Sequence, residues 1–450
     1  MEITHFCNAF VSVKINKTVI ACDPWVGAAS DMSWISYPIH QNGAKIINKL
    51  KPKFIYVSHL HCDHFEPKIL SKYKDKSIKI LIKNYSDQIL KKRLYNIGFN
   101  NIIECHPWKK IKLNKDISIA IIPQITSNTN DIPEQINYDL DTSIVIQSNI
   151  TKEVFFNGVD NPLTLSDYRK VKKFITRKFN KKISATTLQV GAASDYPQCF
   201  LNINRSSEKK KVIKKSLTNL NLKLKILQPD IHFSISGGYI LSGKFSALNQ
   251  YVASPTYYQS LKYIKQKKCK ILNIQGGNSV ILKKNVCYLN KGKFLKDKLN
   301  QKKIIKKYSS KKYFYSGDFK KINLEDIDDA FNKSYENYIK KLNSLPIKTD
   351  WDVEFIIYKN LLINSKGKID YNNSKLLKRY FIKYSSFKTK IIKKNYSKLK
   401  CHLDYNLFYG LLKRKYKNWN QPASGSLILY ERKPNKFDPN LFMSLNYLAS

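Results

Sequence analysis

The feature that most constrains this sequence is a group of ligand-type side chains directly after a short apolar run. Residues 54–57 have the pattern of a buried strand, and His59, His61, Asp63 and His64 follow at once. On an extended segment, positions i, i+2 and i+4 point the same way, and the following bend turns the last histidine inward. Imidazole nitrogens and carboxylate oxygens bind divalent transition metals at about 2.0–2.2 Å. The spacing therefore predicts a metal site at the end of this strand.

A chance grouping of surface histidines is the alternative interpretation. The chain has eight histidines in 450 residues, and three of them fall within this six-residue segment. Four such side chains would also repel or desolvate one another without a cation between them. We therefore favour a divalent metal ion as the cofactor.

The segment 58–65 resembles the signature loop of the metallo-β-lactamase superfamily. The resemblance implies an α+β fold, a metallo-β-lactamase-like αββα sandwich, with the metal site where strand-end loops meet. It also implies that His59 and His61 serve one metal position, while Asp63 and His64 serve the other.

Asp160 follows a later strand, in the segment 157–161, and resembles the bridging carboxylate of that superfamily. An aspartate that only stabilises a turn is the alternative. On this resemblance Asp63 and Asp160 are the expected catalytic residues. Two imidazoles of the usual pattern are missing, because the strand ends at 122–127 and 271–276 contain no histidine. The expected occupancy is therefore one ion per chain, iron or zinc.

Other segments resemble the CMP-N-acetylneuraminate hydroxylase branch of that superfamily, namely 23–38, 191–200, 236–251 and 418–447. This resemblance implies oxidative chemistry with iron and dioxygen on a nucleotide-sugar. That branch receives its electrons from a Rieske centre in the same chain, which needs Cys-x-His and Cys-x-x-His ligand pairs. The sequence contains no Cys-x-x-His, so we expect no Rieske domain. Either a separate redox partner supplies electrons, or the chain performs other chemistry.

The loops expected around the metal site contain six candidate substrate-binding residues. Glycine amides can bind an anionic group, and aromatic rings can stack on a base or a sugar. Core packing is the alternative for each aromatic ring taken alone. The candidates are Trp25, Trp34, Gly191, Tyr196, Gly237 and Gly238.

The net charge of +47 comes from 80 Lys and Arg residues against 33 Asp and Glu residues, and Lys supplies nearly all of the positive charge. Nucleic-acid readers favour Arg, so we expect an anionic small molecule rather than a nucleic acid. A nuclease of the same superfamily is the alternative that the charge supports. No apolar run is long enough to span a membrane, and neither a secretory signal nor paired cysteines are evident, which predicts a cytoplasmic protein.

The predicted organisation is a metal-binding catalytic domain over 1–290, a Lys-rich linker and helix over 291–345, and a smaller α+β domain over 346–450. In the last part of the chain, the residue pattern predicts helices at 324–342 and 374–384, with strands near 353–358 and 426–430.

Three functions remain open at this stage. The first is an oxygenase-like metal enzyme, because two histidines and one carboxylate on iron suit dioxygen chemistry. The second is a hydrolase of a phosphoester, lactone or amide, because a bound metal lowers the pKa of water to about 7. The third is a non-catalytic binding module whose metal site is vestigial. The identity of the ligands alone does not choose among them.

Overall fold

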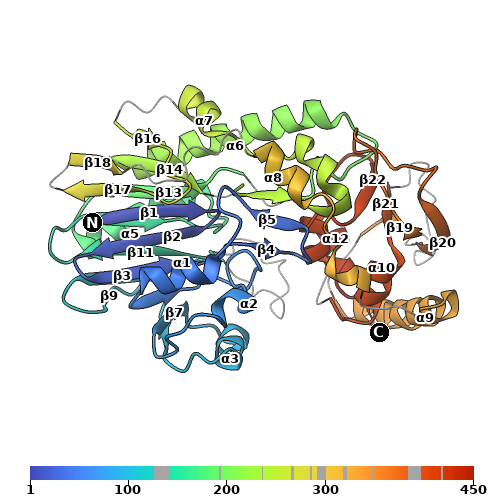
Figure 1. Ribbon diagram of the computed structural model, residues 1–450, viewed down its shortest axis with the longest axis horizontal. Coiled ribbons are helices and arrows are strands. Elements are labelled where there is room, and N and C mark those ends of the chain that lie inside the picture. Colours follow the sequence, from blue (N-terminus) through green and yellow to red (C-terminus); the bar gives the residue numbers. More distant parts are fainter. Residues whose placement is uncertain are drawn as a thin grey trace.

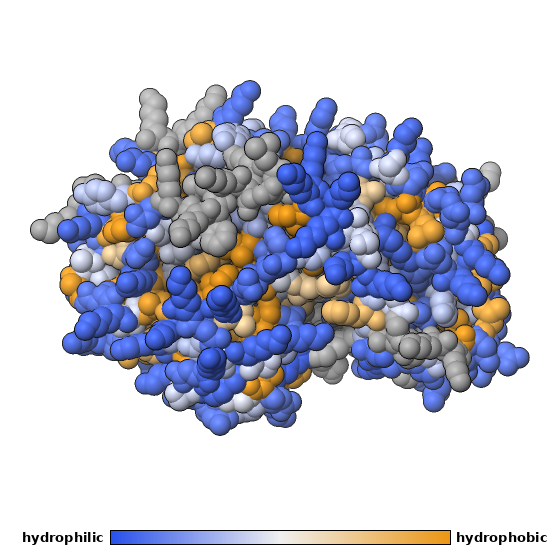
Figure 2. Space-filling view, in the orientation of Figure 1, coloured by the Kyte–Doolittle hydropathy of each residue, from blue (hydrophilic) through white to orange (hydrophobic). Residues whose placement is uncertain are grey.

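The computed structural model of the protein describes residues 1–125, 141–191, 194–235, 237–264, 268–283, 286–290, 301–317, 322–345, 349–383, 397–416 and 419–449. Two large sheets lie in the N-terminal part of the molecule, and a smaller sheet with its own helices lies in the C-terminal part (Figure 1). Hydrophilic side chains cover most of the face seen in Figure 2, as the lysine-rich composition predicts. No helix among the described residues is both long and apolar enough to cross a membrane.

The first sheet has eight strands, and the strand that leads to the metal motif lies inside it. Its order is β18 (Val286–Asn290), β17 (Asn278–Lys283), β1 (Glu2–Cys7), β2 (Phe10–Ile15), β3 (Thr18–Cys22), β6 (Phe54–Tyr56), β7 (Lys79–Lys83) and β8 (Ile102–Cys105). The outer face of this sheet packs against three helices, α1 (Gly43–Leu50), α2 (Pro67–Leu70) and α3 (Ile89–Asn96).

The second sheet has seven strands and carries the later motif residues. Its order is β16 (Lys270–Leu272), β14 (Ile231–Ile235), β13 (Ala185–Gln189), β12 (Val154–Asn157), β11 (Thr142–Ser148), β10 (Ile117–Pro123) and β9 (Ile111–Lys112). Its outer face packs against α5 (Leu165–Phe179) and α6 (Arg205–Leu227), and α7 (Tyr257–Tyr263) lies beside them.

Alternation of side chains along the strands builds the four layers. Residues such as Val11 and Val13 of the first sheet meet Ile119, Ile121 and Phe233 of the second in one buried core. The intervening residues point outward and pack under the helices. The predicted α+β class and the αββα sandwich are therefore confirmed.

The C-terminal part is built on a four-stranded sheet ordered β20 (Lys375–Ile382), β19 (Trp351–Asn360), β21 (Ser397–Asp404) and β22 (Leu429–Lys433). Its helices are α9 (Leu324–Asn343), α10 (Tyr405–Leu412), α11 (Asn420–Ser424) and α12 (Pro439–Leu445). Phe331 of α9 packs on Phe355 and Phe408, so this helix covers the C-terminal sheet. The first ten residues of the predicted linker, 291–300, lie outside the described residues.

The predicted helix at 374–384 is wrong, because this segment forms strand β20. It pairs antiparallel with β19, and Phe355 lies opposite Tyr380. Near the end of the strand the burial alternates: Tyr380 and Ile382 are buried, whereas Phe381 is 47% exposed. Pairing with a neighbouring strand overrides the local helical preference of a Lys- and Leu-rich segment.

A small sheet joins the two parts of the molecule. It contains β15 (Tyr239–Leu241), β5 (Trp34–Ser36) and β4 (Ala28–Ala29), and it is followed in the chain by the 3-10 helix η1 (Gly243–Tyr251). Helix α8 (Gln301–Tyr308) packs on it, and the turn η3 (Phe314–Gly317) follows. One continuous hydrophobic cluster runs from this sheet into the C-terminal sheet. Backbone bonds from Leu201 N to Tyr430 O (2.7 Å) and from Tyr430 N to Cys199 O (2.8 Å) link the two parts further.

Candidate metal centre

The metal motif lies on the loop that follows β6. This strand is parallel to both β3 and β7, so its carboxyl end opens at one edge of the first sheet. The carboxyl end of β12 lies at the same edge of the second sheet and is followed by Asp160. Two ligand groups form where these loops meet.

The first group contains His59, His61 and Asp141. The Nε2 atom of His59 lies 2.7 Å from Nδ1 of His61 and 3.1 Å from Oδ1 of Asp141. His59 is fully buried, whereas His61 is exposed. This group therefore faces both the protein interior and solvent.

Asp141 is a candidate ligand that the sequence reasoning missed. The residue pattern indicates ligands at the carboxyl ends of strands, whereas Asp141 precedes strand β11. Strands β10 and β11 are antiparallel, with Pro123 opposite Thr142, so the start of one strand lies beside the end of the other. The backbone N–H of Gln124 donates to the carbonyl of Asp141 at 3.0 Å. A carboxylate thus lies where an imidazole was expected and not found.

The second group contains Asp63, His64 and Asp160. The Nε2 atom of His64 lies 3.2 Å from Oδ2 of Asp160 and 3.5 Å from Oδ2 of Asp63. Asp63 and His64 are buried, and the side chain of Asp160 is 15% exposed. The structure therefore brings together all five of the metal ligands that the sequence predicts, three of them here and His59 and His61 in the first group.

Neighbouring polar groups hold these side chains in place. The carboxylate of Asp23 accepts hydrogen bonds from the backbone N–H of Ser58 (2.8 Å) and from its hydroxyl (2.7 Å). It also lies 3.0 Å from Nδ1 of His64, so it fixes which ring nitrogen faces the metal position. On the other side, the amide of Asn8 donates to Oδ2 of Asp63 at 2.9 Å.

The spacing of the donor atoms fits bound divalent ions. Ligand atoms about 2.1 Å from an ion, at angles of about 90–109°, lie roughly 3.0–3.4 Å apart. The contacts of His59 and His64 with the other members of their groups run from 2.7 to 3.5 Å, and all ligand atoms of a group lie within 4.8 Å of one another. Small movements of the side chains would therefore admit an ion into each group.

The electrostatics of the two groups also suit cations. Burial and the neighbouring imidazoles hold the pKa of His59 well below its usual value, so it stays neutral, as a metal ligand must be. Burial alone lowers the pKa of His64, but the charges of Asp63, Asp160 and Asp23 raise it well above the usual value. A carboxylate-rich cluster of this kind attracts positive charge, whether from a proton or from a metal ion.

The six candidate substrate-binding residues have other contacts in the structure. Trp25 and Trp34 are 0% and 2% exposed, as expected if these rings pack in the core. Trp34 stacks on Tyr239. The hydroxyl of Tyr196 donates to Glu208 at 2.6 Å.

The three candidate glycines allow close packing within the protein. A Cβ atom at Gly191 or Gly237 would press on Ser254, and one at Gly238 would collide with the backbone of Asn8. Their role in substrate binding stays a prediction.

Tyr239 is a further residue beside the centre. It lies on β15, and burial together with the charges of Asp63 and Asp160 raises the pKa of its hydroxyl. A neutral phenol therefore lies near the second group. No local sequence signal marks it, because β15 is brought to the site by its pairing with β5.

Comparison with known proteins supports the sequence resemblance. The chain is 34% identical over 105 residues to a Mycolicibacterium smegmatis protein named for a Rieske 2Fe-2S centre, covering 23% of this chain and 20% of that protein. It is 24% identical over 337 residues to the inactive cytidine monophosphate-N-acetylneuraminic acid hydroxylase of Homo sapiens, covering 68% and 57%. The hydroxylase of Asterias rubens matches at 28% over 127 residues, covering 27% and 19%. The matched part of the chain thus spans between about one fifth and three fifths of the length of each of these relatives. No protein-family model matches it.

Two sheets, their flanking helices and the position of the metal loop together decide the assignment of the fold. The chain resembles the metallo-β-lactamase superfamily. Among solved structures, Igni18, a metallo hydrolase from Ignicoccus hospitalis, matches with a TM-score of 0.43 and 15% identity, covering 64% of this chain and 99% of that one. CmlA, a diiron β-hydroxylase from Streptomyces venezuelae, matches with a TM-score of 0.41 and 13% identity, covering 61% and 53%. At TM-scores below 0.5, neither likeness bears on function.

Proposed function

We propose that this protein is a metal-dependent enzyme that binds two divalent ions, one in each ligand group. The observation that carries the proposal is the convergence of ligand atoms, which lie within 4.8 Å of one another in each group. The sequence-based expectation of a single ion rested on the absence of two imidazoles from the usual pattern. Asp141 completes the first group, and Asp160 completes the second.

We further propose oxidative chemistry with iron. The first group offers two imidazoles and one carboxylate, the donor set that non-haem iron(II) oxygenases use. When bound there, iron would supply the activation of dioxygen. The similarity to cytidine monophosphate-N-acetylneuraminic acid hydroxylases supports a nucleotide-sugar, or a similar anionic molecule, as the substrate.

The residues of this chain would hold and orient the ions. Asp23 sets the tautomer of His64, Asn8 sets the orientation of Asp63, and exposed His61 marks the side open to substrate. Electrons would come from a separate redox partner, since the Cys-x-x-His pair that a Rieske centre needs does not occur in this sequence.

A hydrolase is the second candidate function. Three protein ligands per ion leave a coordination position for water, and the exposed edge at His61 gives water access to it. In that case zinc would be the ion, and a phosphoester, lactone or amide would be the substrate. A non-catalytic binding module with a vestigial site is the third.

Elemental analysis of protein purified without oxygen tests these proposals. We expect two iron ions per chain, and a spectrum of two weakly coupled iron(II) sites would support the oxidative proposal. Two zinc ions that persist after growth with added iron would favour the hydrolase. A chain that retains no metal under either condition would overturn both enzymatic proposals and leave the binding module.

A further inference from the structure

Ser58 directly precedes the first metal ligand, and its hydroxyl and its carbonyl group bind different partners. The hydroxyl donates to Oδ2 of Asp23 at 2.7 Å and lies 2.9 Å from Nδ1 of His59. The carbonyl oxygen accepts two hydrogen bonds of 2.8 Å, from the hydroxyls of Tyr85 and Thr142. Because Ser58 is fully buried, water does not compete for these bonds. They therefore fix the start of the metal loop.

The hydrogen atoms of this network decide which ring nitrogen His59 presents to the first metal position. A carboxylate only accepts hydrogen bonds, so the single proton of the Ser58 hydroxyl points to Asp23. The hydroxyl oxygen can then only accept from Nδ1 of His59, which must carry a hydrogen. In the neutral ring Nε2 is left with a lone pair, and it faces Oδ1 of Asp141 at 3.1 Å. A lone pair and a carboxylate oxygen this close favour a cation between them.

Thr142 joins the two sheets at this same position. It is the first residue of β11 and follows Asp141, the ligand that the second sheet contributes to the first group. Its hydroxyl donates to the carbonyl of Ser58, on the loop that follows β6 of the first sheet. The hydroxyl of Tyr56 lies 2.6 Å from the oxygen of Thr142 and is the donor, because Thr142 gives its own proton to Ser58. A buried chain of hydrogen bonds thus links β6, the residue beside Asp141 and the metal loop.

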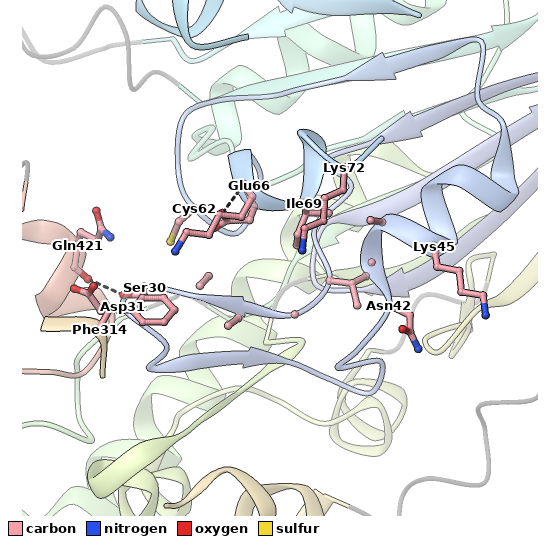
Figure 3. Close-up of a pocket in the computed structure, with 17 residues that line it drawn as sticks. Ser30, Asp31, Asn42, Lys45, Cys62, Glu66, Ile69, Lys72, Phe314 and Gln421 are labelled. Carbon is pink, nitrogen blue, oxygen red and sulfur yellow. Dashed lines mark hydrogen bonds between the residues drawn. The ribbon is translucent and has the colours of Figure 1, made fainter. Parts of the chain in front are cut away.

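A pocket lies on a different side of the metal loop. Figure 3 shows that Cys62 and Glu66 line it. Of the described residues that line this pocket, none belongs to either ligand group. A hollow provides no partner atoms for packing, so the hydrogen bonds of Ser58 hold the loop from inside the sandwich.

We propose that Thr142 is a positioning residue for the first metal position, where it holds Asp141 against His59 through the carbonyl of Ser58. Its hydrogen bond joins the chain neighbours of two ligands, and it closes a ring with the contact between Asp141 and His59. Aspartate has a shorter side chain than histidine, so the backbone that carries it must be held close to the ion. Thr142 thereby allows Asp141 to serve where an imidazole was expected. This inference rests on the proposed binding of an ion by the first group.

Thr142→Val tests this role, because valine has the shape of threonine but no hydroxyl. Chelator competition measures the affinity of each metal position, and the ion that His61→Ala loses identifies the first position. We expect the affinity of the first position to fall at least about tenfold and that of the second by less than about twofold. Thr142→Ser keeps the hydroxyl and should retain most of the affinity of the unaltered chain.

Tyr85→Phe is the matched control. Its hydroxyl donates to the same carbonyl at the same distance of 2.8 Å, and its ring is 3% exposed, but no ligand adjoins it in the chain. Urea unfolding should show a loss of stability in both variants, whereas only Thr142→Val should weaken the first position. Equal weakening of that position by the two variants would overturn the proposal, because the loss would then come from the carbonyl of Ser58 and not from the strand of Asp141.

The outcomes also separate this inference from the proposed function. If the unaltered chain binds two ions and Thr142→Val binds them as tightly, the positioning role is wrong and the proposed function stands. If no ion binds in the first group of the unaltered chain, both fail together. Should Thr142→Val not fold, Tyr56→Phe takes its place, because it removes the donor to Thr142 and should weaken the first position more than the second. An equal or reversed effect on the two positions would overturn the proposal.

Discussion

The two parts of the molecule bury acidic side chains in opposite ways. In the C-terminal part, buried acids are paired with cationic side chains. Glu354 is bonded to Arg379 and Lys398, at 2.8 and 2.7 Å, and Asp404 lies 2.5 Å from the ammonium of Lys244. These acids are neutralised within the protein and need no further ion.

In the N-terminal sandwich, the acids around the metal loop have no such cations. Among the described residues, the ion pairs of Asp23, Asp63 and Asp160 are with histidine alone, and all three share His64. One imidazole carries at most one positive charge, against three carboxylates. The comparison teaches that the buried acids paired with lysine or arginine are neutralised within the fold, whereas the cluster of acids around one imidazole keeps an excess of negative charge that favours a cation.

The largest effect is expected from His61→Ala, which removes an exposed ligand of the first group. We expect the loss of one ion per chain and a fall in turnover of about a thousandfold or more, with little change in the free energy of unfolding. Metal analysis and denaturant titration measure the two effects. The control is His106→Ala, which removes another exposed histidine and should retain both ions. If His61→Ala still bound two ions per chain, the proposed role of His61 as a ligand would be wrong.

Asp404→Asn tests the opposite side of the comparison. Asp404 accepts hydrogen bonds from the backbone N–H of Leu361 and from the hydroxyl of Tyr315, both at 2.7 Å, besides its pair with Lys244. Because Lys244 is left without its charge partner, we expect the free energy of unfolding to fall by about 3 kcal/mol, with the metal content unchanged.

Asp328→Asn is the matched control for that experiment. Asp328 also accepts from a lysine and a tyrosine, Lys378 and Tyr380, but its side chain is 32% exposed. The substitution Asp328→Asn should therefore lower the free energy of unfolding by less than about 1 kcal/mol. Equal costs at the two positions, measured by urea unfolding, would contradict the role given to burial.

Asp23→Asn sharpens the comparison inside the metal centre. The amide keeps the shape of the carboxylate but no longer fixes the tautomer of His64. We expect metal affinity at the second group to fall by about 10–100-fold and affinity at the first group to fall less, because Asp23 contacts His64 directly but reaches His59 only through Ser58. Competition with a chelator measures both affinities. Equal weakening of the two positions would show that the groups do not bind independently.

The smallest effect concerns Glu431 and pH. A hydrogen bond from His402 and another from Lys400 lower its pKa from 4.5 to about 2, although burial opposes them. A carboxyl group with a lowered pKa stabilises the fold above its unfolded value of 4.5, and this contribution is lost as the pH falls toward 2. We expect the unaltered chain to be more stable than Glu431→Gln by about 1 kcal/mol at pH 6, after allowance for solvent screening. The difference should shrink at pH 3. If urea unfolding gave the same difference in the free energy of unfolding at both pH values, the pairing of Glu431 with His402 and Lys400 would be refuted.

Much of the sandwich could be predicted because its strands follow local rules. The buried strand β6 of the sandwich lies where the residue pattern indicates, as do helix α9 and strand β19 of the C-terminal part. Four of the five predicted ligands lie on one short loop, so a single strand-to-loop transition was enough to place them.

What the sequence did not reveal depends on pairing between distant segments. Asp141 reaches the centre because β10 and β11 are antiparallel, and no local pattern marks it. Asp23 contacts His64, which lies 41 residues later in the chain, and Asn8 contacts Asp63, which lies 55 residues later. Strand β20 was mistaken for a helix because its pairing with β19, not its own composition, decides its conformation.

The hydrophobic cluster shared by the small joining sheet and the C-terminal sheet has a consequence for dissecting the chain. Rings from both halves, such as Trp34 and Tyr239 on one side and Trp351 and Tyr430 on the other, are buried in it together. A fragment cut near residue 290 would expose its half of these rings to water and would be prone to aggregate. The catalytic sandwich therefore cannot be minimised by truncation, and thermal unfolding of the intact chain should proceed in one step.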